Sequence, residues 1–219
     1  MLHATAVLGA PEDSDERSAF FSGTSGAAYR IAGHRLCLDE IEHGILRANA
    51  PQVGKSVPII DGDDPRIVFV LPKLDRALPL TKPKPFFLHA SCFGHAGKLN
   101  GRLACRALAA RIHFALNCGA RSCPPIKFYN ADRVEESLQL AAQAFLEADL
   151  EVHGSTVVCT RLLVWYGGDF GSTVADVISC LQGMLATDSA LYQKLTTVME
   201  FQDEVTMEFR AYDWSSNSE

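Results

Sequence analysis

The pattern of hydrophobic and polar positions along the chain predicts helices interleaved with short hairpins. The strongest pattern follows Asn130, where "ADRVEESLQLAAQAFLEAD" places apolar residues every three or four positions and predicts an amphipathic helix with Asn130 as its N-cap. Another helix is predicted to begin after Asp39, which serves as N-cap, with Glu42 completing a capping box. The same reasoning predicts helices at residues 172–185 and 189–198, and hairpins at residues 28–38 and 150–160.

Several other stretches carry weaker patterns. Residues 12–26 are mostly polar and are predicted to form a loop, whereas "RIVFVLP" at residues 66–72 predicts a strand. Residues 111–117 fit both a strand and a helix, and their alternation favours the strand. Residues 79–102 contain prolines and glycines without a clear period, which predicts a loop or an insertion.

Together these elements predict an α+β fold, in a single domain that spans residues 1–217 and leaves 218–219 as a tail. The 219 residues, 47% of them apolar and 21% charged, are enough to bury a sizeable core. The net charge of −6 and the lack of any lysine- or arginine-rich block argue against nucleic-acid binding.

The chain is expected to be a cytoplasmic protein without membrane contacts. The N-terminal "MLHATAVLGAPEDSDER" lacks the basic segment and the apolar run of a secretory signal, and no apolar run approaches the roughly 20 residues that span a bilayer. The seven cysteines follow no disulfide-framework spacing, which predicts reduced thiols in a reducing compartment. A protein partner stays open, and no cofactor is expected.

The candidate chemistry lies in "HFALNCGARSCPP", residues 113–125. A cysteine acts as a nucleophile only as the thiolate, and a nearby imidazole that is itself oriented by a carboxylate or amide favours that form. This loop therefore predicts Cys118 as nucleophile, with Cys123 as the alternative, and His113 as base. Asp213 or Asn117 would orient the imidazole. The competing interpretation is that both cysteines are small buried hydrophobic residues and that His113 is a core histidine.

Two further kinds of site use the same loop. His113, Cys118 and Cys123 are ligand types that suit zinc, but their spacing matches no familiar finger, and a fourth ligand would have to come from His43 or Asp213. No metal is therefore expected, and a structural zinc domain is kept as an alternative. A redox pair of the two cysteines lacks the C-x-x-C spacing that usually tunes thiol potentials.

Residues 42–47 form a second candidate constellation, with a binding role. His43 could serve as a second acid or base, and Arg47 could hold a carboxylate. The alternative is a structural helix stabilised by Glu42 as a capping residue and by an Arg47 ion pair. The motif "WYGGDF" at residues 165–170 is predicted to be structural.

The ordered motifs resemble a known family, the domain of unknown function 547. The resemblance is carried by "YRIAGHRLCLDEIEHGILR", "HFALNCGARSCPPIKFYNADRVEESLQLAAQAFL", "WYGGDF" and "YDWSSN", and it covers the chain from Met1 to about Asn217. The family name implies no established reaction. The fold expected for it here is α+β of the papain or transglutaminase type, with a cysteine-dependent hydrolase or acyl-transfer site. A non-enzymatic interaction domain is the alternative.

The chain departs from the family pattern at both ends and in the middle. The family usually opens with a helix that precedes "LHA", so the chain is expected to be truncated at its N-terminus. Residues 79–110 exceed what the family holds there and are expected to be an insertion or a gene-model error. Candidate ligands in or beside this stretch are therefore set aside: His89, Cys92, His95 and Cys105. Ser216 replaces the leucine of the usual closing motif.

Overall fold

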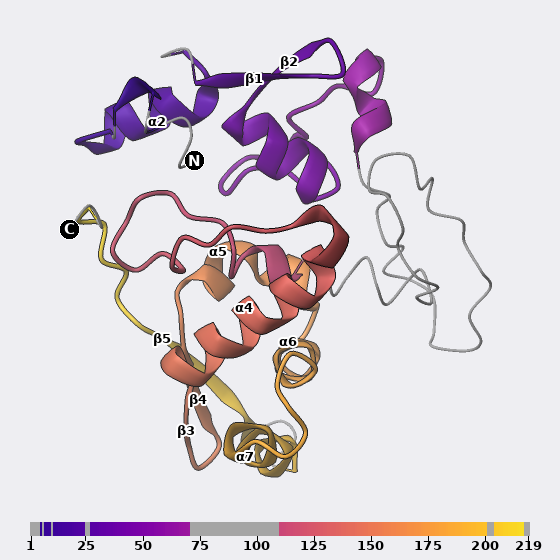
Figure 1. Cartoon of the computed structure of the whole chain (residues 1–219). Coiled ribbons are helices and arrows are strands. Elements are labelled where there is room, and N and C mark those ends of the chain that lie inside the picture. The colour runs from indigo at the N-terminus through magenta and orange to yellow at the C-terminus, as the bar shows by residue number, and fades with distance from the viewer. Residues whose placement is uncertain are drawn as a thin grey trace. The chain divides into compact units, whose positions relative to one another are not determined.

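The structure is a computed structural model, which describes residues 5, 7–9, 11–24, 27–70, 110–200 and 204–216. These residues form two compact units, which are treated separately below. The first unit contains the described parts of Met1–Lys73, Asn117–Arg121 and Ser215–Glu219, and the second contains those of Leu74–Leu116 and Ser122–Trp214. Both mix helices with short strands, which confirms the α+β class (Figure 1). The single domain over residues 1–217 stays a prediction.

The first unit is built around one hairpin and several short helices. Its elements are α2 (Ser14–Ser22), β1 (Ala28–Ile31), β2 (His34–Cys37), the π-helix η1 (Glu40–Leu46) and the 3₁₀ helix η2 (Pro65–Phe69). The predicted hairpin is confirmed, with Ile31 paired to His34. Ala32 and Gly33 form its turn, and both adopt positive φ, at 46° and 86°. Positive φ at both central residues is the geometry of a two-residue hairpin turn.

Helix α2 corrects the predicted loop at residues 12–26. The Asp13 side chain accepts hydrogen bonds from the backbone N–H groups of Asp15 and Glu16, both at 2.8 Å, and so caps the first turn. Gly23 ends the helix in the left-handed conformation. Phe20 is buried in a small cluster with Ala27 and Leu38, against which Phe21 also packs, so apolar residues within the polar stretch dock the helix.

Two more predictions in the first unit were wrong. Asp39 makes no side-chain cap bond, because its carboxylate accepts instead from Gln52 Nε2 at 2.8 Å, and the helix that follows is of the π type. The described part of the strand predicted at residues 66–72 is a 3₁₀ helix. Asp64 caps that helix through the Arg66 N–H, and Pro65 occupies its first turn. Proline is pre-organised for that position, and this outweighs the β-branched pattern.

The second unit packs helices on a three-stranded sheet. Its elements are η3 (Ala131–Arg133), α4 (Val134–Asp149), β3 (Glu151–His153), β4 (Thr156–Cys159), α5 (Leu162–Phe170), α6 (Val174–Gln182), α7 (Ala190–Met199) and β5 (Thr206–Phe209). β4 is central, antiparallel to β3 and parallel to β5. The hairpin predicted at residues 150–160 is therefore confirmed, as are the helices after Asn130, Thr173 and Ser189.

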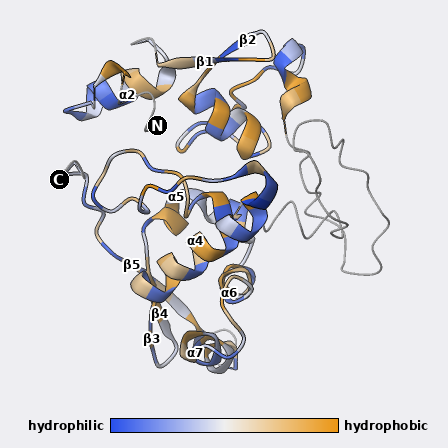
Figure 2. Ribbon diagram, in the orientation of Figure 1, coloured by the Kyte–Doolittle hydropathy of each residue, from blue (hydrophilic) through white to orange (hydrophobic). Residues whose placement is uncertain are grey.

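Helices α4, α5, α6 and α7 and strand β4 contribute buried residues to one hydrophobic core in the second unit. α4 carries hydrophobic and hydrophilic residues along its length, as an amphipathic helix should (Figure 2). The largest fully buried side chains of this core are Phe114, Phe170, Leu146, Ile178, Leu181, Leu195, Val157 and Val198. Phe114 and Phe170 meet edge to face, with ring centroids 5.7 Å apart, so the candidate loop and α5 share one core.

The prediction of a strand at residues 111–117 was wrong. Residues 110–112 are helical and turns follow them, with the N–H groups of Phe114 and Ala115 bonded to the carbonyls of Arg111 and Ile112. His113 and Phe114 are consequently both buried, rather than on opposite faces of a strand. Seven residues are too few to separate a period of two from one of 3.6, and packing decides the outcome.

Some predictions fall outside the described residues. The stretch at residues 79–109 is one of them, together with His89, Cys92, His95 and Cys105. Within the described ranges, none of the helices is both long enough and apolar enough to cross a bilayer.

Candidate functional site

A buried histidine–aspartate pair is the best-defined polar feature of the second unit. His113 Nε2 lies 2.9 Å from Asp169 Oδ2, and the two side chains are 1% and 10% exposed. An ionised carboxylate can only accept hydrogen bonds, so the ring proton belongs on Nε2 and is donated to Asp169. The neutral ring then carries its lone pair on Nδ1. A histidine held in one tautomer by a carboxylate has the electronic arrangement of a general base.

Helix α5 positions this pair. Tyr166, Asp169 and Phe170 follow the i, i+3, i+4 spacing that places side chains on one face of a helix. The Tyr166 ring stacks on the His113 ring at a centroid distance of 4.2 Å and an angle of 21°. The Phe170 ring lies 5.6 Å from it. The imidazole is therefore fixed both by a hydrogen bond and by aromatic packing.

The two residues predicted to orient His113 make other contacts in the structure. Asn117 Oδ1 accepts from the Gly119 N–H at 2.7 Å and so forms a turn, in which Gly119 has a φ of 87°. The backbone N–H of Asp213 donates to Ser122 Oγ at 2.9 Å, and the orienting role of its carboxylate stays a prediction. The carboxylate bonded to His113 is that of Asp169, in the motif interpreted as structural. The Y-x-x-D-F spacing of that motif was the signal that could have indicated this role.

The two candidate nucleophiles belong to different units. Cys118 lies in the first unit and Cys123 in the second, and both are half-buried. Cys123 Sγ lies 3.2 Å from the Tyr212 hydroxyl. Either atom can be the donor in this contact. Tyr212 is itself held by aromatic contacts with Trp165 and Trp214, at centroid distances of 4.8 and 4.6 Å.

Two other cysteines are more deeply buried than the candidate nucleophiles. Cys37 and Cys159 are buried. Burial raises the pKa of the Cys37 thiol, and it raises the pKa of Cys159 to about 12. These two thiols are therefore unreactive at neutral pH, in agreement with a role as small hydrophobic residues.

The binding residues predicted at 42–47 form a connected cluster in the first unit. His43 and Arg47 are buried, and Arg47 Nη1 lies 2.7 Å from His43 Nδ1. A guanidinium can only donate, so Nδ1 accepts and the His43 proton lies on Nε2. Glu42 Oε1 is 3.8 Å from that nitrogen. The same Arg47 nitrogen donates to the Pro51 carbonyl at 3.1 Å.

The backbone around this cluster has unusual geometry. The π-helix η1 precedes Ala48 and Asn49, which both adopt positive φ, at 53° and 57°. The Asn49 amide donates to the Ile60 carbonyl at 2.8 Å and accepts from the Ile60 N–H at 3.1 Å. This pair of bonds holds the strained turn in place. π-helices and positive φ at non-glycine residues are both over-represented at functional sites, and the binding role of these residues stays a prediction.

No metal site emerges from the described residues. Within them, no three side chains of histidine, cysteine, aspartate or glutamate are grouped closely enough to hold an ion. The zinc alternative, built on His113, Cys118 and Cys123 with His43 or Asp213, therefore gains no support from this part of the chain.

Comparison with known proteins identifies the family. The family model described as "Protein of unknown function, DUF547" matches residues 1–146 of the 219. The chain belongs to this family. The matched range includes His43, Cys118 and Cys123, whereas Asp169 and Asp213 lie beyond it. No curated protein and no solved structure matches the chain, so the papain or transglutaminase type of fold stays a prediction.

Proposed function

We propose that this DUF547 protein is a cysteine-dependent hydrolase or acyl transferase in which His113 is the general base. The observation that carries the proposal is the buried hydrogen bond between His113 and Asp169. The Tyr166 ring stacks on the same imidazole. A buried pair supports the proposal, because burying two ionisable groups costs free energy that apolar side chains of similar size would not cost.

The proposed reaction has two halves. His113 Nδ1 takes the proton of the cysteine thiol, and the thiolate attacks the carbonyl carbon of an ester, thioester or amide. The leaving group departs with the proton that His113 returns, and a thioester remains on the enzyme. In the second half His113 deprotonates water or an amine, which attacks the thioester and releases the thiol. Asp169 stabilises the imidazolium that forms in each half.

The nucleophile is assigned from the sequence. Cys118 is the first candidate, as the sequence predicts, because it lies in the same loop as His113 and directly before the turn at Gly119. Cys123 is the second, supported by the Tyr212 hydroxyl beside its sulfur. Asp213 and Asn117 keep their predicted orienting role as alternatives to Asp169. Glu42, His43 and Arg47 are proposed to bind a ligand, with His43 acting as a donor through Nε2.

Acylation by an activated ester tests this function. The full chain is incubated with p-nitrophenyl acetate, and acetylated cysteines are identified by peptide mass spectrometry. We expect an acetyl thioester at Cys118 or Cys123, with release of p-nitrophenolate, that is lost in His113→Gln. Cys180→Ala is the matched control for Cys118→Ala and Cys123→Ala, since Cys180 is also half-buried. Equal acetylation of Cys180 and the candidate cysteines would contradict the proposal.

An interaction domain is the second candidate function, and one surface feature favours it. Phe128 is 95% exposed, and Ile126, two residues earlier, is 44% exposed. Adjacent exposed apolar side chains are typical of surfaces that bind other proteins. If binding is the function, Phe128→Ser abolishes association with a purified partner, and Cys118→Ala leaves it intact. The opposite pattern would favour the enzyme.

A further inference from the structure

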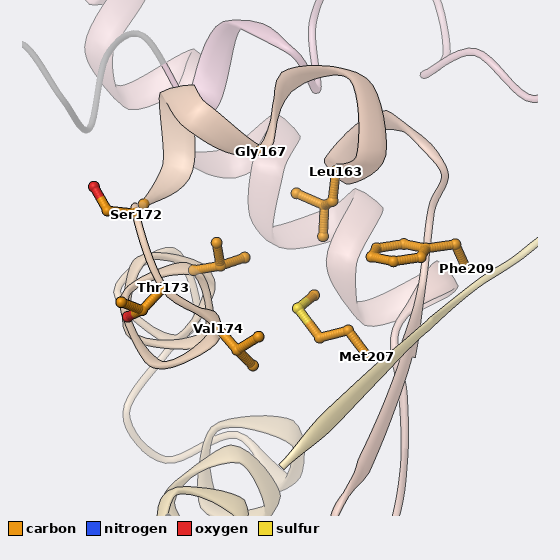
Figure 3. Close-up of a pocket in the computed structure, with 9 residues that line it drawn as sticks. Leu163, Gly167, Ser172, Thr173, Val174, Met207 and Phe209 are labelled. Atoms are coloured by element: carbon orange, nitrogen blue, oxygen red, sulfur yellow. The ribbon is translucent and has the colours of Figure 1, made fainter. Parts of the chain in front are cut away.

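An apolar pocket lies in the second unit on the face of α5 that carries Leu163 and Gly167 (Figure 3). Its volume is about 230 Å³. Helix α5, the start of α6 and strand β5 contribute the residues that line it: Leu163, Gly167, Gly171, Ser172, Thr173, Val174, Val177, Met207 and Phe209. The pocket does not contain His113, Asp169 or either candidate cysteine, so it is separate from the site described above.

The lining determines what the pocket can hold. None of its lining residues carries a charge, and Leu163 and Val177 are buried. The Thr173 hydroxyl and the backbone N–H groups of Ser172 and Thr173, at the edge of the pocket, take part in the cap of α6. Thr173 Oγ1 accepts from the Asp176 N–H, and the Asp176 carboxylate accepts from the N–H groups of Ser172 and Thr173. A charged ligand would lose its hydration here without gaining a partner, so the pocket selects neutral apolar groups.

Two glycines shape this space. At Gly171 an added Cβ would come within 2.7 Å of the Val177 backbone nitrogen, so only glycine allows α5 and α6 to approach this closely. At Gly167 an added Cβ would meet no atom within 4 Å. Gly167 thus leaves open a volume that a side chain could fill, and glycine in a helix lowers stability relative to alanine. The open volume beside this less stable helical position is therefore a candidate site for an apolar ligand.

We infer that this pocket binds a small, uncharged apolar molecule or group, of the size of a substituted benzene ring or a short alkyl chain. The pocket opens to solvent, and its volume of about 230 Å³ leaves room for a group of the size of benzene. Met207 is flexible and polarisable, which lets it adapt to such ligands. Successive helical residues are about 100° apart, so Gly167 and Asp169 lie on different faces of α5. The inference therefore does not depend on the proposed acyl-transfer function.

The test uses toluene as the probe and benzoate as its charged counterpart. The full chain is labelled with ¹³C at the methionine methyl groups, and Met207 is assigned by its loss in Met207→Leu. We expect a saturable shift of the Met207 methyl signal with toluene and none with benzoate. Gly167→Leu, which fills the pocket from α5, should abolish the toluene shift. Val164→Leu, an enlargement of an exposed residue on the same helix, should leave it unchanged.

A second filling variant protects the test against a folding defect in the first. Val174→Phe fills the pocket from α6, and far-ultraviolet circular dichroism reports whether each variant is folded. The inference is overturned if toluene gives no saturable shift in the wild-type protein. It is equally overturned if the shift persists in a folded Gly167→Leu or Val174→Phe variant.

Discussion

Removing the Asp169 carboxylate should destabilise the second unit and disable the proposed base. A hydrogen bond to a charged group contributes about 1.5–3 kcal/mol, and leaving a buried donor unsatisfied costs about 1–3 kcal/mol. His113 is only 1% exposed, so its Nε2–H could not turn to water if the carboxylate were lost. We therefore expect Asp169→Ala to cost about 1.5–3 kcal/mol. Asp169→Asn keeps an acceptor and should cost less.

Urea denaturation followed by circular dichroism measures these free energies of unfolding. In the acylation assay, Asp169→Asn should lower the rate about 100-fold or more, because the amide can no longer stabilise the imidazolium. Asp213→Asn is the matched control, since Asp213 is the aspartate that the sequence predicts for the same role. The reasoning is refuted if Asp169→Ala unfolds within about 0.5 kcal/mol of the wild-type protein. It is also refuted if Asp213→Asn, rather than Asp169→Asn, abolishes acylation.

Two further predictions concern the first unit. Gly44→Ala should lower the free energy of unfolding of the first unit by about 1–3 kcal/mol, because the added Cβ would lie 2.5 Å from Ile60 Cδ1. Gly62→Ala is the control, because its added Cβ would meet no atom within 4 Å. Thermal unfolding should show little effect of this second change. Arg66 holds the pKa of Asp64 at about 2. The stabilisation from a lowered carboxyl pKa is present above the unfolded value of about 3.9 and is lost as the pH falls through about 2. Arg66→Gln should move the Asp64 carboxyl titration upward in NMR, and no movement would refute the assignment.

The elements that the sequence predicted correctly are those with long or redundant local signals. The helix after Asn130 has a cap and a sustained apolar stripe, and the hairpins have Gly33 and Gly154 at their turns. The strand predicted at residues 111–117 failed because a short apolar segment fits two periods. The helix predicted after Asp39 is present at Glu40–Leu46, but it is of the π type. The hydrogen bonds of a π-helix reach one residue further than those of an α-helix, and the residue pattern does not reveal that difference.

The candidate site was predicted in part. His113 was selected from its own loop, but Asp169 lies 56 residues away and had been interpreted as structural. Local sequence cannot show which of several aspartates reaches a given histidine, because tertiary packing decides that contact. The cluster of Glu42, His43 and Arg47 was selected from spacing on a helix face, and the structure adds the direction of the Arg47–His43 hydrogen bond.

The reactivity of the cysteines tests the central claim most directly. Iodoacetamide labelling of the folded chain, followed cysteine by cysteine against pH, reports which thiol ionises. Our account predicts rapid labelling of Cys118 or Cys123, with a midpoint well below the value of about 8.5 for an ordinary thiol, and a loss of that advantage in His113→Gln. Cys37 and Cys159, whose pKa values burial raises, should stay unlabelled. If neither candidate cysteine labels until the protein unfolds, residues 113–125 are a packed corner and the proposed function is wrong.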